Sequence, residues 1–295
     1  YESELHEKKL SEAALEELIR KGKVEEKDGA IWLKMENSDD KERVLVKSNG
    51  AKTYFLNDLA YHKTKYERGF DWIIDIWGAD HHGYIPRMKE GIKALGLDEK
   101  KFQVLIHQLV SVKKGEEVLK MSKRAGTFYT LRQLIEETSK DAVRFFFTMR
   151  SPNTHLIFDI ELAKKQSNEN PLYYVQYAHA RISSIIENAR LKGFKTDSID
   201  GFGEYSITDD DRKILKKIFW FEKTLNQSLK DLSPHHITTY LIELAGEFHA
   251  YYEKNRIIDE SKPIETKARL FILKGAKETI KKGLGLIGVN APEKM

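Results

Sequence analysis

Cysteine is absent from the 295 residues of the chain, and this absence excludes two kinds of stabilising site. Without a thiol the chain can form neither a disulfide nor a zinc site built on thiolates. Long apolar runs are absent too: no stretch approaches the roughly 20 residues that a bilayer-spanning helix needs, and no signal peptide opens the chain. We therefore expect a cytoplasmic protein with no membrane partner.

A strong charge of one sign is also missing, because 50 Lys and Arg face 46 Asp and Glu, a net charge of +4. The whole surplus lies in residues 164–295. Such a surplus points weakly to nucleic acid, and solubility explains most surpluses of this size. Hydrophobic residues make up 40% of the chain, which is enough for a full core, and the length suggests about two domains.

The first part of the chain alternates strand and helix signals. Residues 1–21 have the apolar stripe of one amphipathic helix, and residues 24–34 read as a hairpin. Residues 73–77 predict a buried parallel strand, and residues 102–112 predict a further strand. A helix is expected to start near Tyr54, and further helical segments are expected at 85–95, 130–137 and 141–149. This order is typical of an α/β nucleotide-binding (Rossmann-like) domain with a parallel sheet, here partial, over residues 1–165.

From residue 166 to 295 the pattern is helical throughout. Pro171 stands near the start of one helix, Thr208 followed by three aspartates caps the next, and Ser233-Pro234 begins another. A last helix covers roughly residues 265–283. These features predict an all-α bundle of antiparallel helices as the second domain.

The string LKMSKRAGTF, residues 119–128, holds the first candidate site. Lys120 and Lys123 lie three apart with Ser122 between them, and Gly126 follows. Flexible lysines on a glycine-containing loop can follow a phosphate and stabilise charge on a leaving pyrophosphate. A solvated basic loop is the alternative, because one-third of the chain is charged.

Two further candidates lie in the strand–helix part of the chain. Tyr54 and Asp58 are four apart at a helix start, so both can face one cleft and hold a guanidinium. The alternative is a core tyrosine beside a helix-start aspartate. Gly78, Asp80 and His81 follow the strand at 73–77, where doubly wound folds bind nucleotides. Polar contacts to a sugar or an amino group are expected there rather than a metal site, because adjacent histidines point in different directions.

Aromatic and arginine side chains recur at helical intervals in the second part: Tyr174, Tyr177, Arg181, Tyr252 and Arg256. Aromatic faces beside arginines suit an unpaired RNA loop, whose bases can stack on them. An aromatic stripe buried in the core is the alternative. His179 is expected to be a packed or hydrogen-bonded histidine.

Five strings occur in one order over nearly the whole chain: YFLNDLAYH, GADHHGYIPRM, LKMSKRAGTF, DAVRFFFTMRSP and NPLYYVQYAHARI. Together they resemble arginyl-tRNA synthetases of the bacterial type, which are class I aminoacyl-tRNA synthetases, and LKMSKRAGTF resembles their KMSKS signature. The resemblance implies arginine, ATP with Mg²⁺ and arginine tRNA as partners, no tightly bound cofactor or metal of its own, and a monomeric full-length enzyme.

The resemblance also implies residue roles. Arginine binding falls to Tyr54, Asp58 and His81, and ATP binding to Gly78, Asp80, His81, Met121 and Lys123. The catalytic loop residues are Lys120, Ser122 and Lys123, with Arg124 where the family often has serine. The anticodon loop would meet Tyr174, Tyr177, Arg181, Tyr252 and Arg256 on the helical domain.

The family's HxGH motif is the main departure, because no His-x-Gly-His occurs in these residues. The chain therefore resembles the C-terminal part of a longer enzyme, beginning inside its catalytic domain and ending, at GVNAPEKM, as the family does. We expect it to bind tRNA without charging it. A non-catalytic tRNA-binding module and a class I synthetase of another specificity, such as cysteine, are the alternatives; the absent cysteines and the Tyr54–Asp58 pair disfavour the cysteine enzyme.

Overall fold

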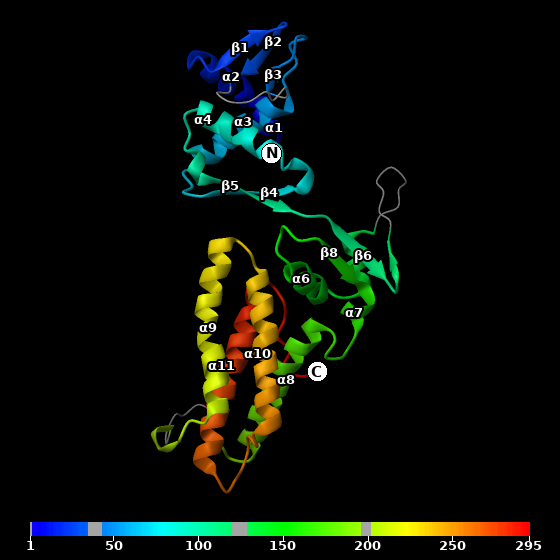
Figure 1. Cartoon of the computed structure of the whole chain (residues 1–295), viewed down its shortest axis with the longest axis vertical. Helices are drawn as coiled ribbons and strands as arrows, with labels where there is room; N and C mark the ends of the chain where they lie inside the picture. The colour runs from blue at the N-terminus through cyan, green and yellow to red at the C-terminus, as the bar shows by residue number, and fades with distance from the viewer. Residues whose placement is uncertain (1, 35–42, 120–128, 196–201) are drawn as a thin grey trace. The chain divides into compact units, whose positions relative to one another are not determined.

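A computed structural model describes residues 2–34, 43–119, 129–195 and 202–295, and divides the chain into two compact units (Figure 1). The first unit is Tyr1–Leu109 and the second Val110–Met295. The division falls inside the predicted first domain, so the second unit holds the end of that domain as well as the helical bundle. Within the described residues, no helix has the length and apolar character needed to cross a bilayer.

The first unit opens with two helices rather than the single one predicted. α1 ends at Glu7 and α2 begins at Leu10, because Lys9 adopts a left-handed backbone with φ of 52° that interrupts the helix between them. Asp28 and Gly29 turn the predicted hairpin, both with positive φ. The elements of this unit are α1 (Glu2–Glu7), α2 (Leu10–Arg20), β1 (Val24–Lys27), β2 (Ala30–Leu33), β3 (Val44–Val46), α3 (Tyr54–Glu67), β4 (Ile73–Gly78), α4 (Tyr84–Ala94) and β5 (Phe102–His107), with short 3₁₀ turns at Ala79–His81 and Glu99–Lys101.

Strands β4 and β5 pair in parallel, with Ile73 opposite Phe102 and Gly78 opposite His107. One face of this pair packs on α3 and α4 in a core that includes Leu59, Ile73 and Ile92. Gly91 lets the two helices approach, since a Cβ there would lie 2.3 Å from a methyl carbon of Leu59. The predicted parallel strand at 73–77 is confirmed, but its predicted burial holds on one face alone, because Ile76 on the opposite face is 69% exposed.

The apolar run at 102–112 is not one strand, which corrects a second prediction. It divides into β5 and β6, and β6 pairs in parallel with β8 and antiparallel with β7 in a separate sheet of the second unit. Leu109, between the two strands, is 74% exposed. The elements before the bundle are β6 (Val110–Lys114), β7 (Glu117–Val118), α5 (Leu131–Glu137), α6 (Lys140–Thr148), β8 (Leu156–Asp159) and α7 (Ile160–Lys164).

Four long helices form the bundle: α8 (Pro171–Leu191), α9 (Asp209–Asp231), α10 (His235–Lys254) and α11 (Pro263–Leu286), with a 3₁₀ turn at Phe202–Glu204 before α9 (Figure 1). Their starts follow the predicted signals. Pro171 opens α8 behind the cap Asn170, and Thr208 caps α9 in a capping box with Asp211. The buried Asp211 also accepts hydrogen bonds from Tyr205 and Tyr251, both at 2.6 Å.

The C-terminal segment after α11 returns along α8. The side chain of Gln176 donates to the Asn290 carbonyl at 2.9 Å, and the His179 ring contacts the Pro292 carbonyl at 2.8 Å. Arg144 of α6 donates to the Ile287 carbonyl at 2.8 Å. These contacts join the end of the chain to α6 and α8, and they confirm His179 as a packed, hydrogen-bonded histidine.

Candidate functional site

The start of α3 presents Tyr54 and Asp58 to one cavity in the first unit. Thr53 caps this helix, and its hydroxyl also donates to the Val44 carbonyl at 2.7 Å, which ties the helix start to β3. Asp58 lies one turn after Tyr54, so both side chains line the same cavity of about 310 Å³. The sequence pattern therefore placed this pair correctly on one face.

Among the described residues, no cationic side chain donates a hydrogen bond to the Asp58 carboxylate, although the nearby His62 and Lys65 favour its charged form. The recorded side-chain partner of Asp58 is the Tyr84 hydroxyl, which donates at 3.0 Å. Burial raises the pKa of Asp58, and burial beside Asp58 raises the pKa of Tyr84 as well. A half-buried carboxylate held by a neutral donor is an attractive position for a cationic ligand.

A second carboxylate lines the same cavity but is already neutralised. Asp75 of β4 accepts hydrogen bonds from Lys65, at 2.6 Å and 2.9 Å, and from His62 at 2.8 Å. Burial alone would raise the pKa of Asp75, but the hydrogen bonds of His62 and Lys65 bring it down to about 2. His62 also contacts the Asp58 carbonyl at 2.7 Å, so this ion cluster holds α3 against β4.

The remaining wall of the cavity is aromatic. Trp77 lies 5.6 Å from Tyr84 and 6.2 Å from His81 between ring centres, and all three line the cavity. Gly78 lines it too, as predicted. A Cβ at Gly78 would lie 2.6 Å from an Asp80 carboxylate oxygen, so a larger residue there would displace the Asp80 side chain. The Asp80 side chain itself is 84% exposed and lies outside the set of residues that line the cavity.

Six residues that line this cavity were not predicted as site residues: Tyr61, His62, Asp75, Ile76, Trp77 and Tyr84. Lys65, which binds Asp75, was not predicted either. Two signals were present. His62 and Lys65 follow Asp58 at helical spacing on the same face of α3, and Asp75 interrupts an apolar strand. Neither signal alone shows that the three side chains meet.

The predicted phosphate-loop residues Lys120, Met121, Ser122 and Lys123 lie outside the described part of the chain. The elements on either side are described. The hairpin of β6 and β7 precedes the loop, and α5 follows it behind a capping box of Thr130 and Gln133.

In the bundle, three of the five predicted RNA-contact residues line one cavity of about 780 Å³: Arg181, Tyr252 and Arg256. Arg181 donates to the Tyr252 hydroxyl at 2.6 Å, and its guanidinium carbon lies 5.0 Å from the centre of the Tyr252 ring. We call this the α8–α10 cavity. Its lining holds three cations, Arg181, Lys254 and Arg256, and the anion Glu253. The half-buried Tyr252 ring also stacks on Phe248, with ring centres 5.9 Å apart, so a base could contact only the part of the ring that stays exposed.

Tyr174 and Tyr177 belong to a separate aromatic cluster around His249. The His249 ring lies 4.7 Å from Tyr174 and 5.9 Å from Tyr177, and Tyr173 stacks on Tyr177 with ring planes 11° apart. Burial lowers the pKa of His249 and raises that of Tyr174. Tyr174 is partly buried against the core, so the alternative of an aromatic stripe in the core describes it well.

Comparison with known proteins gives the family. The family model described as tRNA synthetases class I (R), catalytic domain, matches residues 1–178. The chain belongs to the arginyl class I tRNA synthetases. The model of the DALR anticodon binding domain matches residues 175–295 of this synthetase chain, which covers the bundle.

Curated relatives agree. The synthetase chain is 51% identical over 295 residues to the arginine–tRNA ligase of Elusimicrobium minutum, covering 100% of this chain and 55% of that protein. It is 48% identical over 295 residues to that of Listeria monocytogenes, covering 100% of this chain and 53% of that protein. The chain therefore spans about half the length of the curated relatives it matches.

Two solved structures share the fold. One from Campylobacter jejuni is 34% identical with a TM-score of 0.89, over 100% of this chain and 63% of that chain. The arginyl-tRNA synthetase of Thermus thermophilus is 19% identical with a TM-score of 0.78, over 97% of this chain and 58% of that chain. These likenesses agree with the predicted order of an α/β part followed by a helical domain.

Proposed function

We propose that this chain supplies the arginine-binding part of the catalytic domain and the anticodon-binding domain of an arginine–tRNA ligase. The observation that carries the proposal is the pair of carboxylates in one cavity, of which Asp75 is neutralised by Lys65 and Asp58 is not. A carboxylate whose recorded side-chain hydrogen bond comes from a neutral hydroxyl, in a small aromatic cavity, favours a ligand with one cationic head.

The guanidinium of arginine would meet Asp58, with Tyr54 packing beside it and His81 nearer the amino acid's polar end. A planar guanidinium can donate two parallel hydrogen bonds to a carboxylate, which the point charge of lysine cannot. The match to the catalytic-domain model of the arginyl enzymes also favours arginine as the substrate over the alternative of a cysteine-specific synthetase.

ATP would bind next to this cavity, at Gly78, Asp80 and His81, with Met121 and Lys123 contributed by the phosphate loop. Mg²⁺ would accompany the phosphates. Lys120, Ser122 and Lys123 would stabilise charge that develops on the leaving pyrophosphate, so they are the proposed catalytic residues. In a full-length enzyme, Lys123→Ala should slow arginine activation by an amount corresponding to about 3 kcal/mol while leaving arginine affinity nearly unchanged. An unchanged rate would exclude a catalytic role for the loop.

Arginine tRNA would bind through the bundle, with Arg181, Tyr252 and Arg256 at an unpaired loop and Tyr174 and Tyr177 next along α8. This chain alone is expected to bind tRNA without charging it, because the HxGH motif that helps this family bind ATP is absent from its residues. The whole enzyme is expected to be a cytoplasmic monomer. Charging of tRNA by the purified chain would contradict this proposal.

The first test is binding of the chain to labelled transcripts of an arginine tRNA, a cysteine tRNA and a third, unrelated tRNA at two salt concentrations. A preference for the arginine transcript that survives the higher salt supports anticodon reading by the bundle. Equal binding that disappears at higher salt would reduce the contact to phosphates on a basic surface and contradict the proposal.

A further inference from the structure

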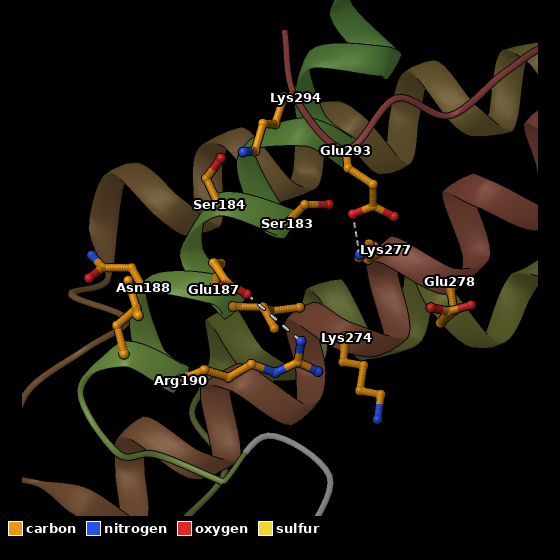
Figure 2. Close-up of a pocket in the computed structure, with 12 residues that line it drawn as sticks. Ser183, Ser184, Glu187, Asn188, Arg190, Lys274, Lys277, Glu278, Glu293 and Lys294 are labelled. Carbon is orange, nitrogen blue, oxygen red and sulfur yellow. Dashed lines mark hydrogen bonds and ion pairs between the residues drawn. The ribbon is translucent and has the colours of Figure 1, made fainter.

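The bundle carries its two hollowed surfaces along α8. A cavity of about 490 Å³ opens between α8, α11 and the C-terminal segment, where Figure 2 shows Lys277 facing Glu293. This cavity shares Ser184 and Asn188 with the α8–α10 cavity. The described lining of the two cavities includes no residue of α9, which packs on α10 and α11 and lies on the other side of them from α8 in Figure 1. The outer face of α9 is therefore a separate surface.

This outer face is strongly basic. From residue 212 to residue 230, α9 has six lysine and arginine residues and one acidic residue, Glu222. The resulting net charge of +5 exceeds the +4 of the whole chain, so the basic surplus of the second part of the chain is concentrated on one helix. Lys216, Lys223 and Lys230 are all exposed, and no ion pair is recorded for them within the described part of the chain. We call these three residues the outer lysines.

Two large aromatic side chains lie in the middle of the basic face. Phe219 is 77% exposed and Trp220 is 47% exposed. The centre of the Trp220 ring lies 5.3 Å from Nζ of Lys216 and 5.6 Å from Nζ of Lys223. Exposed aromatic side chains with a charged rim are typical of protein docking surfaces, where the rings supply much of the affinity and the charges select and steer the partner.

The outer lysines follow a regular repeat. They occur at every seventh residue, which places neighbours two helical turns and about 10.5 Å apart along the axis. Two helices that pack side by side at a shallow angle also meet every seven residues, and the charges beside such a seam pair with opposite charges on the partner helix. The spacing therefore fits a partner helix that carries carboxylates at the same interval.

α10 already makes this kind of contact with α9. Glu243 of α10 binds Lys217, whose ammonium lies 5.8 Å from the centre of the Trp220 ring and 5.4 Å from that of Tyr240. A carboxylate and a ring of one helix thus hold a lysine of its neighbour. A second acidic helix can make the same contact with the outer lysines.

We propose that the outer face of α9 docks an acidic amphipathic helix of a partner protein. Phe219 and Trp220 would contact its apolar side, and the outer lysines would bind its carboxylates. A second copy of this chain does not fit, because two faces of the same positive charge repel each other. A single RNA strand fits less well, because adjacent side chains on a helix point about 100° apart and the two rings cannot form one row for successive bases. The inference goes beyond the proposed function and does not depend on it.

The test uses the chain and a synthetic helical peptide with leucines along one face and glutamates beside them at seven-residue intervals. Binding is followed by the anisotropy of a dye on the peptide. The tryptophan emission should also shift to the blue, because Trp220, the only tryptophan after residue 109, becomes covered. Phe219→Ala should weaken peptide binding about tenfold. Trp220→Phe should abolish the emission shift.

Two double variants test the charges. Lys216→Gln, Lys223→Gln should weaken binding of the acidic peptide about tenfold and reduce its dependence on salt. The matched control Lys93→Gln, Lys100→Gln removes the same charge from exposed positions in the first unit and should change the affinity less than about twofold.

A charge exchange gives the sharpest readout. Lys216→Glu, Lys223→Glu should prefer a peptide that has lysine in place of glutamate, because the attractive and repulsive pairs change places. Absence of binding to the acidic peptide up to about 1 mM overturns the proposal, as does equal binding of the acidic and basic peptides by the unaltered chain.

The alternative occupants have their own outcomes. Tighter binding of an oligouridylate that depends on Phe219, or self-association of the chain that Phe219→Ala abolishes, overturns the proposal. Binding of arginine tRNA should stay unchanged in every α9 variant, because α9 lines neither cavity within the described residues. A loss of that binding would assign the face to RNA and overturn the inference. Failure of the peptide experiment leaves the proposed function standing, and absence of a tRNA preference leaves this inference standing.

Discussion

The cavity lined by Tyr54 and Asp58 and the bundle surface use charge in opposite ways. In the first unit, Asp75 accepts hydrogen bonds from Lys65 and His62, whereas the recorded side-chain partner of Asp58 is the neutral hydroxyl of Tyr84. On the bundle, Arg181 and Arg256 stay near the surface, and Arg181 rests on the Tyr252 ring.

This contrast follows from the size of the expected ligands. A small cation can be surrounded, so one half-buried carboxylate gives a strong and selective contact at low dielectric. An RNA loop cannot be surrounded by four helices, so the contact there relies on several exposed cations and ring faces, each of modest strength. The two regions should therefore respond very differently to single substitutions and to salt.

The largest expected effect is on the cavity lined by Tyr54 and Asp58, the proposed arginine site. Asp58→Asn keeps the shape of the side chain and its contact with Tyr84 but removes the charge. Arginine affinity of the chain, measured by calorimetry, should fall on the order of 100-fold, because the guanidinium would be desolvated without a counter-charge. Glu67→Gln, at the far end of α3, is the control. Equal losses of arginine affinity in Asp58→Asn and Glu67→Gln would contradict the proposed difference between the two regions.

Asp75→Asn should act on stability rather than on ligand choice. The folded-state pKa of Asp75 is about 2, below its ordinary value of 3.8, so its stabilising contribution is present above about pH 4 and is lost as the pH falls through about 2. The variant should lower the free energy of unfolding by about 2 kcal/mol at neutral pH, and the difference from the unaltered chain should vanish near pH 2.

Urea denaturation followed by tryptophan fluorescence at several pH values measures this difference. Asp71→Asn, an exposed aspartate in the same unit, should cost little at any pH. A difference for Asp75→Asn that stays constant from pH 7 to 2 would contradict a charge-based role for the cluster.

On the bundle, Tyr252→Ala should weaken binding of arginine tRNA by about 1–3 kcal/mol, the value of one stacked base. The substitution also removes the ring that the Arg181 guanidinium contacts, but it removes no charge. The salt dependence of tRNA binding should therefore change little while the affinity falls. Phe219→Ala on α9, an exposed aromatic residue outside the α8–α10 cavity, is the matched control. Equal effects of the two changes would mean that the ring is not a stacking site.

The smallest expected effect is that of Tyr84→Phe. The ring and its contacts with Trp77 remain, and one hydrogen bond from a neutral hydroxyl donor to Asp58 is lost. Arginine affinity should fall by about 1 kcal/mol. Tyr66→Phe, which loses a hydrogen bond to the Asp98 carbonyl away from the cavity, should leave the affinity unchanged. A loss as large as that of Asp58→Asn would show that Tyr84 does more than orient the carboxylate.

Local signals predicted much of the fold because they act within a few residues. The capping box at Thr208, the proline at the start of α8 and the turn at Asp28-Gly29 are satisfied by neighbours in sequence. The division of residues 102–112 into two strands was not predictable in this way, because partner strands β4 and β8, distant in sequence, decide which stretch pairs where.

The candidate site shows the same limit. Helical spacing placed Tyr54 and Asp58 on one cavity, and Arg181 and Tyr252 were found from an aromatic and arginine pattern on two helices. The hydrogen bonds from Lys65 and His62 to Asp75 needed α3 and β4 in contact. Charge compensation between elements is a property of packing, which periodicity does not encode.

The measurement that tests the central claim most directly is a calorimetric comparison of arginine and citrulline binding to the chain. The citrulline side chain has nearly the same shape as that of arginine but ends in an uncharged group. The comparison therefore isolates the contribution of the Asp58 carboxylate. The account predicts that arginine binds on the order of 100-fold more tightly and that Asp58→Asn abolishes the difference. Equal affinities for the two ligands in the unaltered chain would contradict it.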